Sequence, residues 1–153
     1  MPDATNKSPG QGHLTMKIAI IGSRDFTDYR FFKLKCMRLL SESDSSKMTI
    51  ISGGARGTDR MAERYAREMG IPLKVINAEW DILGKKAGMI RNEEVLLLCT
   101  HVIAFWDGSS PGTRHVIIKA KILNKTLRVV RIRTGAPVSH INPQGSGLFY
   151  ENK

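Results

Sequence analysis

Five short aliphatic runs, separated by longer amphipathic segments, restrict the fold of this chain more than any other feature. Each run has the length and composition of a strand that is buried on both faces. The runs are residues 16–21, 48–52, 73–76, 101–106 and 126–132. Because helical segments connect the strands, and such crossovers are right-handed, the strands are predicted to lie parallel between two helical layers. The expected fold class is therefore α/β, with a three-layer, doubly wound, mostly parallel sheet of about five strands in a Rossmann-like arrangement.

The connecting segments carry apolar residues at helical spacing. The predicted helices cover about residues 28–42, 58–69, 87–98 and 114–123. Thr58 is expected to cap the start of the second helix, and Gly70 to end it. Asn124 is expected to end the last helix in the left-handed conformation.

A single domain is expected, since 153 residues are enough for one core and too few for two full domains with a linker. The chain ends are rich in Pro, Gly, Ser and Asn, which bury too little apolar surface to offset the entropy of ordering. We therefore expect a flexible N-terminal tail over residues 1–15, a Rossmann-like domain over 16–133, and a C-terminal loop or tail over 134–153.

Composition narrows the classes of partner. The formal net charge of +10 favours anionic partners, either the phosphate of a small ligand or a nucleic acid. No apolar run reaches the length of a bilayer span and the polar N-terminus lacks a signal core, so we predict a cytoplasmic protein with no membrane partner. Cys36 and Cys99 have no second Cys or His at ligand spacing, which predicts buried thiols and no metal site. No cofactor is expected.

Three glycine-rich loops follow the carboxyl ends of predicted strands, at residues 22–26, 52–58 and 107–113. In an open parallel sheet these ends share the edge at which ligands bind, so the loops are predicted to meet. Two of them lead into helix N-termini, whose unpaired N–H groups attract phosphate. None matches GxGxxG or GxxxxGK[ST], so an ordinary dinucleotide or triphosphatase site is not predicted.

Four arginines lie in or near these loops, and clustered guanidinium groups need a counter-anion. The alternative is that the glycines only form the tight turns between strand and helix, but three such loops at one edge favour a ligand. The predicted ligand-binding residues are Gly22, Ser23, Arg24, Ser52, Gly53, Gly54, Arg56, Gly57, Thr58, Trp80, Arg91, Asn92, Ser109, Ser110, Gly112, Thr113, Arg114 and His115.

Several motifs occur together and in order: GSRDF at 22–26, SGGARGTDRMAERYA at 52–66, Trp80 followed by GKKAGMIRNEEVL at 84–96, and FWDGSSPGTRHVI at 105–117. On these motifs the chain, over about residues 16–132, resembles the small YspA-like members of the SLOG superfamily. That superfamily also contains the LOG cytokinin-releasing phosphoribohydrolases and the DNA-processing protein of bacterial transformation. The resemblance implies a SLOG-like Rossmann domain that binds nucleotides or nucleotide-derived molecules at its glycine-rich edge.

The resemblance also bears on catalysis. In the LOG enzymes the motif PGGxGTxxE supplies a glutamate that assists cleavage of the N-glycosidic bond, and here Val116 stands in its place. Asp25, Asp107 and Glu93 are the candidate catalytic carboxylates, although Asp25 and Asp107 also suit local turn-capping. Asp59 is interpreted as a first-turn helix residue that favours the helix dipole. Whether the protein is an enzyme stays open.

Aromatic residues offer a surface on which a base would stack. Trp80 is the preferred stacking residue, with core packing as its alternative, whereas Phe26 and Trp106 suit packing. The Arg91–Asn92 pair resembles an RN pair of the superfamily, which implies a ligand role.

Three functions are therefore weighed. The leading hypothesis is a sensor or sequestering protein that binds a small nucleotide or nucleotide-derived ligand, of the ADP-ribose or cyclic-nucleotide type. The alternatives are an N-glycosidic hydrolase or transferase acting on nucleotides, and weak binding of single-stranded nucleic acid through a basic strip. The strip comprises Lys119, Lys121, Lys125, Arg128, Arg131 and Arg133.

A homo-oligomer, dimer or tetramer, is expected, with Leu96 and Leu97 as exposed contact residues.

Overall fold

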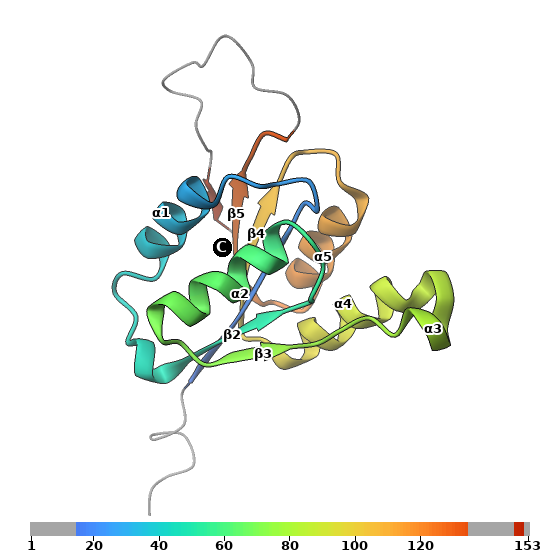
Figure 1. Ribbon diagram of the computed structural model, residues 1–153, viewed down its shortest axis with the longest axis horizontal. Helices are drawn as coiled ribbons and strands as arrows, with labels where there is room; N and C mark the ends of the chain where they lie inside the picture. The colour runs from blue at the N-terminus through green and yellow to red at the C-terminus, as the bar shows by residue number, and fades with distance from the viewer. Residues whose placement is uncertain (1–14, 135–148, 152–153) are drawn as a thin grey trace, which may run out of the picture.

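A six-stranded sheet lies at the centre of the structure, a computed structural model that describes residues 15–134 and 149–151 (Figure 1). Its strand order is β3-β2-β1-β4-β5-β6. Neighbours among β1 to β5 pair in parallel, and β6 pairs antiparallel with β5. The strands are β1 Met16–Gly22, β2 Met48–Ser52, β3 Leu73–Val75, β4 His101–Trp106, β5 Thr126–Arg131 and β6 Phe149–Glu151.

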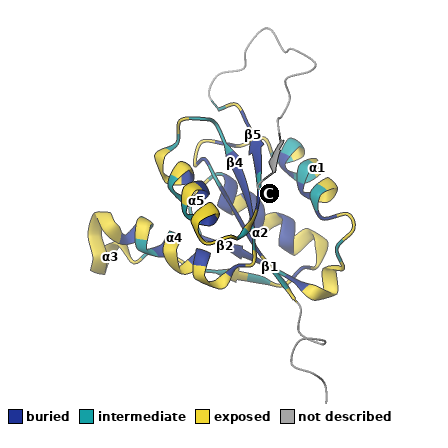
Figure 2. Ribbon diagram, turned by 180° about the vertical axis from the view of Figure 1, so that it is seen from behind, coloured by how far each residue is buried: buried dark blue, intermediate teal, exposed yellow. Residues whose placement is uncertain are grey.

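Helices cover both faces of the sheet, which confirms the predicted three-layer α/β fold. Helices α1 and α2 lie on one face and α4 and α5 on the other, while α3 projects beyond the body (Figures 1 and 2). None of the described helices is long and apolar enough to cross a membrane. The helices are α1 Tyr29–Leu39, α2 Thr58–Met69, α3 Trp80–Leu83, α4 Ala87–Leu98 and α5 Pro111–Ile122, with short 3₁₀ turns η2 Ser45–Lys47 and η3 Gly84–Lys86.

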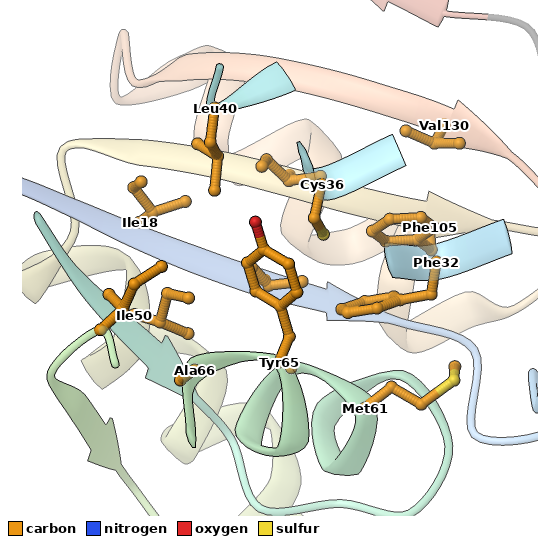
Figure 3. Close-up of a cluster of buried hydrophobic side chains, with 14 of the residues drawn as sticks. Ile18, Phe32, Cys36, Leu40, Ile50, Met61, Tyr65, Ala66, Phe105 and Val130 are labelled. Carbon is orange, nitrogen blue, oxygen red and sulfur yellow. The ribbon is translucent and has the colours of Figure 1, made fainter. Parts of the chain in front are cut away.

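Each central strand is buried on both sides, as its aliphatic composition predicts. In β1, Ile18 and Ile20 belong to the core beneath α1 and α2, whereas Ala19 and Ile21 belong to the core beneath α4 and α5. This alternation follows from the two-residue period of a strand. Figure 3 shows the first core, where the rings of Phe32 and Phe105 lie 4.7 Å apart between centroids. Cys36 and Cys99 are buried free thiols, as predicted.

The order of the strands places a topological switch point between β1 and β4. From β1 the chain runs outward through β2 and β3, then crosses to β4 and continues through β5. The connections after β1 and β4 therefore leave on opposite faces, and a crevice forms between them at the carboxyl ends of the strands.

The structure corrects three local predictions. Strand β6 lies within the segment expected to be loop or tail, because three residues are too few to show a strand period. Gly57, with φ of 75°, caps α2 in place of Thr58, since Thr58 turns its hydroxyl to the main-chain oxygen of Ser23 at 2.9 Å. Helix α3 lies between the predicted strand 73–76 and the predicted helix 87–98, where the sequence predicts no helix, because four residues are too few to show a helical period.

The two residues of α4 that were expected to form a subunit contact, Leu96 and Leu97, differ in how far they are exposed. Leu97 is 74 % exposed, but Leu96 is 1 % exposed and packs in the core beneath α4 and α5. Adjacent helical residues are turned by about 100°, so both cannot share one outer surface. Residues 1–14, 135–148 and 152–153 lie outside the described residues, and so do most of the two predicted tails.

Candidate functional site

An open cavity of about 400 Å³ lies where β1, β2 and β4 end. Its walls include Arg24 from the first glycine-rich loop, Arg56 from the second and Gly112 from the third. The three loops therefore meet, as their positions after parallel strands predict.

The first loop is fixed by its own main chain. The N–H of Ser23 donates to the carbonyl of Phe105 on β4 at 3.1 Å, and the Ser23 carbonyl accepts from the N–H of Thr58 at 3.2 Å. The Ser23 hydroxyl accepts from the N–H of Asp25 at 3.2 Å. These contacts join β1, β4 and the start of α2, so the hydroxyls of Ser23 and Thr58 already take part in folding.

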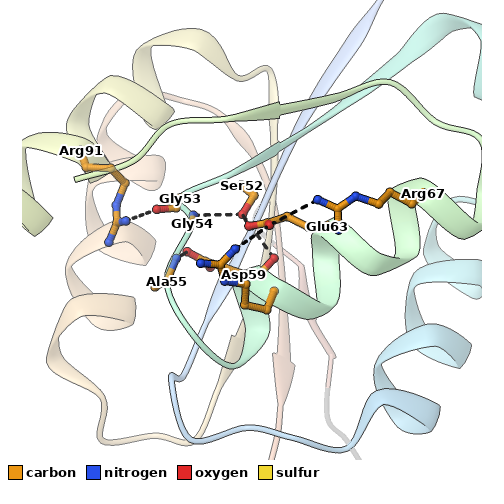
Figure 4. A network of polar contacts seen from close by, with 9 residues as sticks. Ser52, Gly53, Gly54, Ala55, Asp59, Glu63, Arg67 and Arg91 are labelled. Carbon is orange, nitrogen blue, oxygen red and sulfur yellow. Dashed lines mark hydrogen bonds and ion pairs between the residues drawn. The ribbon is translucent and has the colours of Figure 1, made fainter. Parts of the chain in front are cut away.

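The second loop is held from beneath by a buried polar network (Figure 4). The Ser52 hydroxyl donates to the Glu63 carboxylate at 2.8 Å and accepts from the N–H of Gly54 at 3.1 Å. Glu63 is buried, and its carboxylate pairs with Arg60 at 3.2 Å and Arg67 at 3.9 Å. Glu63, which the sequence did not single out, thus supports the loop from α2.

Asp59 is the buried carboxylate of the cavity. It lies in the first turn of α2, as interpreted from the sequence, but it is only 5 % exposed and forms part of the cavity wall. Burial raises its pKa to about 6, and this outweighs the opposing effects of the Ala55 N–H, which donates to it at 3.1 Å, and of Arg91. An acidic residue directly after the glycine-rich loop was the only sequence signal for this position.

Arg91 reaches the same loop from α4. Its Nη1 donates to the Gly53 carbonyl, and its Nε donates to Oδ1 of Asn92 at 2.9 Å. Burial lowers the Arg91 pKa, and the neighbouring charge of Arg24 adds to this effect, whereas Asp59 opposes it. The two hydrogen bonds hold the positively charged guanidinium in place in the wall of the cavity.

The third loop is organised by Asp107. Its carboxylate accepts from the N–H groups of Ser109 at 2.9 Å and Ser110 at 2.7 Å, and from both hydroxyls. Burial opposes ionisation of Asp107, but these hydrogen bonds outweigh it and lower the pKa to about 2. Asp107 lies outside the cavity wall, so its geometry is that of a turn-capping residue.

The first turn of α5 opens onto the cavity through Pro111, Gly112 and Thr113. A Cβ added to Gly112 would meet nothing within 4 Å. Pro111 has no N–H, and the Arg114 N–H already donates to the Ser110 carbonyl at 3.1 Å. The N–H groups of Gly112 and Thr113 are the ones that this helix end offers to an anion.

The other two candidate carboxylates occupy different environments. Asp25 lines the cavity and pairs with Arg56 at 3.2 Å, with both side chains 71 % exposed. Glu93 lies outside the cavity and pairs with Lys119 of α5 at 3.6 Å.

A second hollow of about 390 Å³ adjoins the first, and Arg24, Ala55, Arg56 and Arg91 line both. Trp80 stands in its wall, 48 % exposed, with the Arg24 guanidinium carbon 5.8 Å from the ring centroid. The structure therefore does not place Trp80 in the core. Asn77, which the sequence did not single out, also lines this hollow.

The predicted ligand-binding residues separate into two groups. Those in the wall of one or both hollows are Gly22, Ser23, Arg24, Gly53, Gly54, Arg56, Trp80, Arg91, Asn92, Ser110, Gly112 and Thr113. Those in neither wall are Ser52, Gly57, Thr58, Ser109, Arg114 and His115. The Nε2 of His115 is buried and has no hydrogen-bond partner within the described part of the chain.

The basic strip does not form one surface beside the site. Lys125 donates to the carbonyl of Cys99 at 2.8 Å, next to the amino end of β4. Arg131 lies at the opposite end of β5, with its guanidinium carbon 5.7 Å from the Trp106 ring centroid. Lys119 and Lys121 lie on α5, so the charges of the strip are spread over a helix and over both ends of β5.

Comparison with known proteins agrees with this architecture. Residues 16–82 match the YspA, cpYpsA-related SLOG family, which confirms the resemblance seen in the motifs. The chain is 39 % identical over 80 residues to the Gene 61 protein of Mycobacterium phage D29, an alignment that covers 48 % of this chain and 64 % of that protein.

Two solved structures share the fold. DNA processing protein A from Streptococcus pneumoniae aligns with a TM-score of 0.59 and 19 % identity, over 74 % of this chain and 49 % of its own. DNA processing protein A from Helicobacter pylori, which has a single-stranded DNA binding mode, aligns with a TM-score of 0.56 and 25 % identity, over 74 % of this chain and 64 % of its own. The chain thus spans about half the length of the first protein and less than two thirds of the second.

Proposed function

Starting from a SLOG-type domain whose three loops enclose one cavity, we propose that this protein binds a small nucleotide or nucleotide-derived ligand, with a phosphate in that cavity. The observation that carries the proposal is the convergence of Arg24, Arg56 and Arg91 on the open first turn of α5. Arginine side chains and helix N-termini both favour phosphate. Binding of the ADP-ribose or cyclic-nucleotide type, as a sensor or sequestering protein, is the specific form of this proposal.

The residue at the position of the LOG glutamate supports binding in preference to hydrolysis. The position that carries the LOG glutamate holds Val116, which is buried and lines the cavity with an apolar side chain. An N-glycosidic hydrolase or transferase remains the alternative, and its carboxylate would be Asp25 or Asp59, since both line the cavity. Chromatography of nucleoside monophosphates after incubation with the protein tests it, and release of free base would favour the enzyme.

Calorimetric titration with a panel of nucleotides and ADP-ribose tests the leading proposal. Arg56→Ala should weaken binding by about tenfold to a hundredfold, since hydrogen bonds to charged groups contribute roughly 1.5–3 kcal/mol. Arg114→Ala is the matched control, because Arg114 lies outside both hollows. Absence of binding at millimolar nucleotide, or equal loss in both variants, contradicts the proposal.

Gly112→Ala provides a second, steric test. Since a Cβ at this position meets no neighbouring atom, the fold should tolerate the substitution. A phosphate held by the first turn of α5 approaches the main chain closely, so the added methyl should weaken its binding. Unchanged nucleotide affinity in Gly112→Ala would place the ligand elsewhere.

Single-stranded nucleic acid is the second candidate function. The observations that favour it are the net charge of +10 and the likeness to the Helicobacter pylori protein, which binds single-stranded DNA. Phosphate contacts release counterions, so such binding should weaken steeply as salt increases. Titration of a fluorescent oligonucleotide over a range of salt concentrations tests it, and a flat salt response would remove this candidate.

A further inference from the structure

The two hollows lie next to each other and have chemically different linings. Four residues are common to both walls, so the hollows are neighbours that meet at these side chains. Each volume, about 400 and 390 Å³, falls within the range of roughly 300–1,000 Å³ that is usual for small-molecule sites. The pair is therefore far larger than a phosphate group requires.

The second hollow is suited to a flat, aromatic group. The indole of Trp80 lies in its wall, and the exposed amide of Asn77 makes no hydrogen bond with the described part of the chain. Indole rings stack on bases, and an amide pairs with the donor and acceptor groups on a base edge.

Trp80 is also held in position. A Cβ added to Gly88 of α4 would lie 3.2 Å from Cη2 of Trp80, so the helix backbone approaches the ring closely. The Arg24 guanidinium lies over the ring at 5.8 Å. Arg24 is exposed, so its side chain is free to change rotamer and let a base stack on the indole.

We infer that the second hollow is a base-binding subsite, so that the ligand is a nucleoside phosphate whose base stacks on Trp80 while its phosphate lies at the first turn of α5. This inference rests on the proposed function, because the first cavity supplies the phosphate site. Arg24, Arg56 and Arg91 line both hollows and face the sugar-phosphate portion between them. Asn77 then contacts the base edge and contributes to the choice of base.

Calorimetry with Trp80→Leu and Trp80→Phe tests the subsite. Against nucleoside 5′-monophosphates, Trp80→Leu should lose about tenfold in affinity, the size of loss expected when one stacked base loses its aromatic partner, whereas Trp80→Phe should retain most of it. Ribose 5-phosphate lacks a base, so its affinity should be equal in the wild type and in both variants. Thermal melting checks that the exposed substitution leaves the fold intact.

Intrinsic fluorescence gives an independent readout, since the chain has two tryptophans, Trp80 and Trp106. Nucleotide should quench the wild-type emission, and the quenching should disappear in Trp80→Phe while calorimetry still detects binding. Wild-type affinity for nucleotides in Trp80→Leu, with a loss in Gly112→Ala, would overturn the base subsite and leave the phosphate site standing. Absence of binding for nucleotides and ribose 5-phosphate alike would overturn the proposed function itself.

Discussion

The carbonyl of Gly53 accepts a hydrogen bond from the guanidinium of Arg91 on α4, although α2 and β3 separate the two residues along the chain. The contact ties the glycine-rich loop to a helix on the other face of the sheet. It also explains why position 53 has no side chain. A Cβ there would lie 2.8 Å from Oδ2 of Asp59 and 2.9 Å from Cδ and Nε of Arg91.

Gly53→Ala should therefore destabilise the protein. Both neighbours are buried, so the methyl group forces a shift whose cost is about 1–3 kcal/mol, as in other overpacked interiors. Urea denaturation measures the free energy of unfolding. Gly112→Ala is the matched control, because its Cβ meets open space and its stability should stay near that of the wild type.

Ser52→Ala should destabilise the protein by about 1–2 kcal/mol, because it removes the hydroxyl that joins the buried Glu63 carboxylate to the main chain of the second loop. The Glu63 carboxylate loses a donor at 2.8 Å, and the Gly54 N–H loses an acceptor at 3.1 Å. Ser109→Ala, at an exposed position, should have a much smaller effect in the same denaturation experiment. Equal effects of the two substitutions would show that the buried network contributes little.

Asp59 should make the stability fall as the pH rises from about 4 to about 6. Its pKa is raised to about 6 by burial, against about 3.9 in an unfolded chain, so over this interval the folded protein binds more protons than the unfolded one. Two pKa units correspond to about 2–3 kcal/mol, which the folded state loses across the window. Denaturation at several pH values should show this decline in the wild type but not in Asp59→Asn. Asp107, with its pKa lowered to about 2, acts below this window and in the opposite direction.

Asp25→Asn should strengthen the binding of phosphate-containing ligands. Asp25 pairs with Arg56 at 3.2 Å in the wall of the cavity, so it competes with a bound anion for that guanidinium. The pair is exposed, and such pairs contribute roughly 0.2–1 kcal/mol, so the gain should be at most about fivefold. Calorimetry with ribose 5-phosphate measures it. A large loss of affinity would instead assign Asp25 a direct role toward the ligand.

The sequence predicted the five parallel strands and the two helical layers of this protein, but not strand β6 or helix α3. Aliphatic runs alternating with helical segments predicted the parallel sheet between two helical layers. The position of each glycine-rich loop after a strand predicted that Arg24, Arg56 and Gly112 would line one cavity. Both inferences depend on local pattern and on the geometry that all parallel sheets share.

The partners of individual polar side chains were decided only by the tertiary structure. Asp107 and Asp59 both stand beside glycine-rich loops, yet Asp107 binds its own turn while Asp59 is buried against Ala55 and Arg91. The local sequence was enough to suggest the turn-capping contacts of Asp107, which are two and three residues away, but it could not predict the burial of Asp59, because burial depends on which distant elements pack over a residue. The same holds for Glu63 beneath the second loop. Side-chain partners across the sheet arise from packing between segments that are remote in sequence, and a local pattern carries no information about that packing.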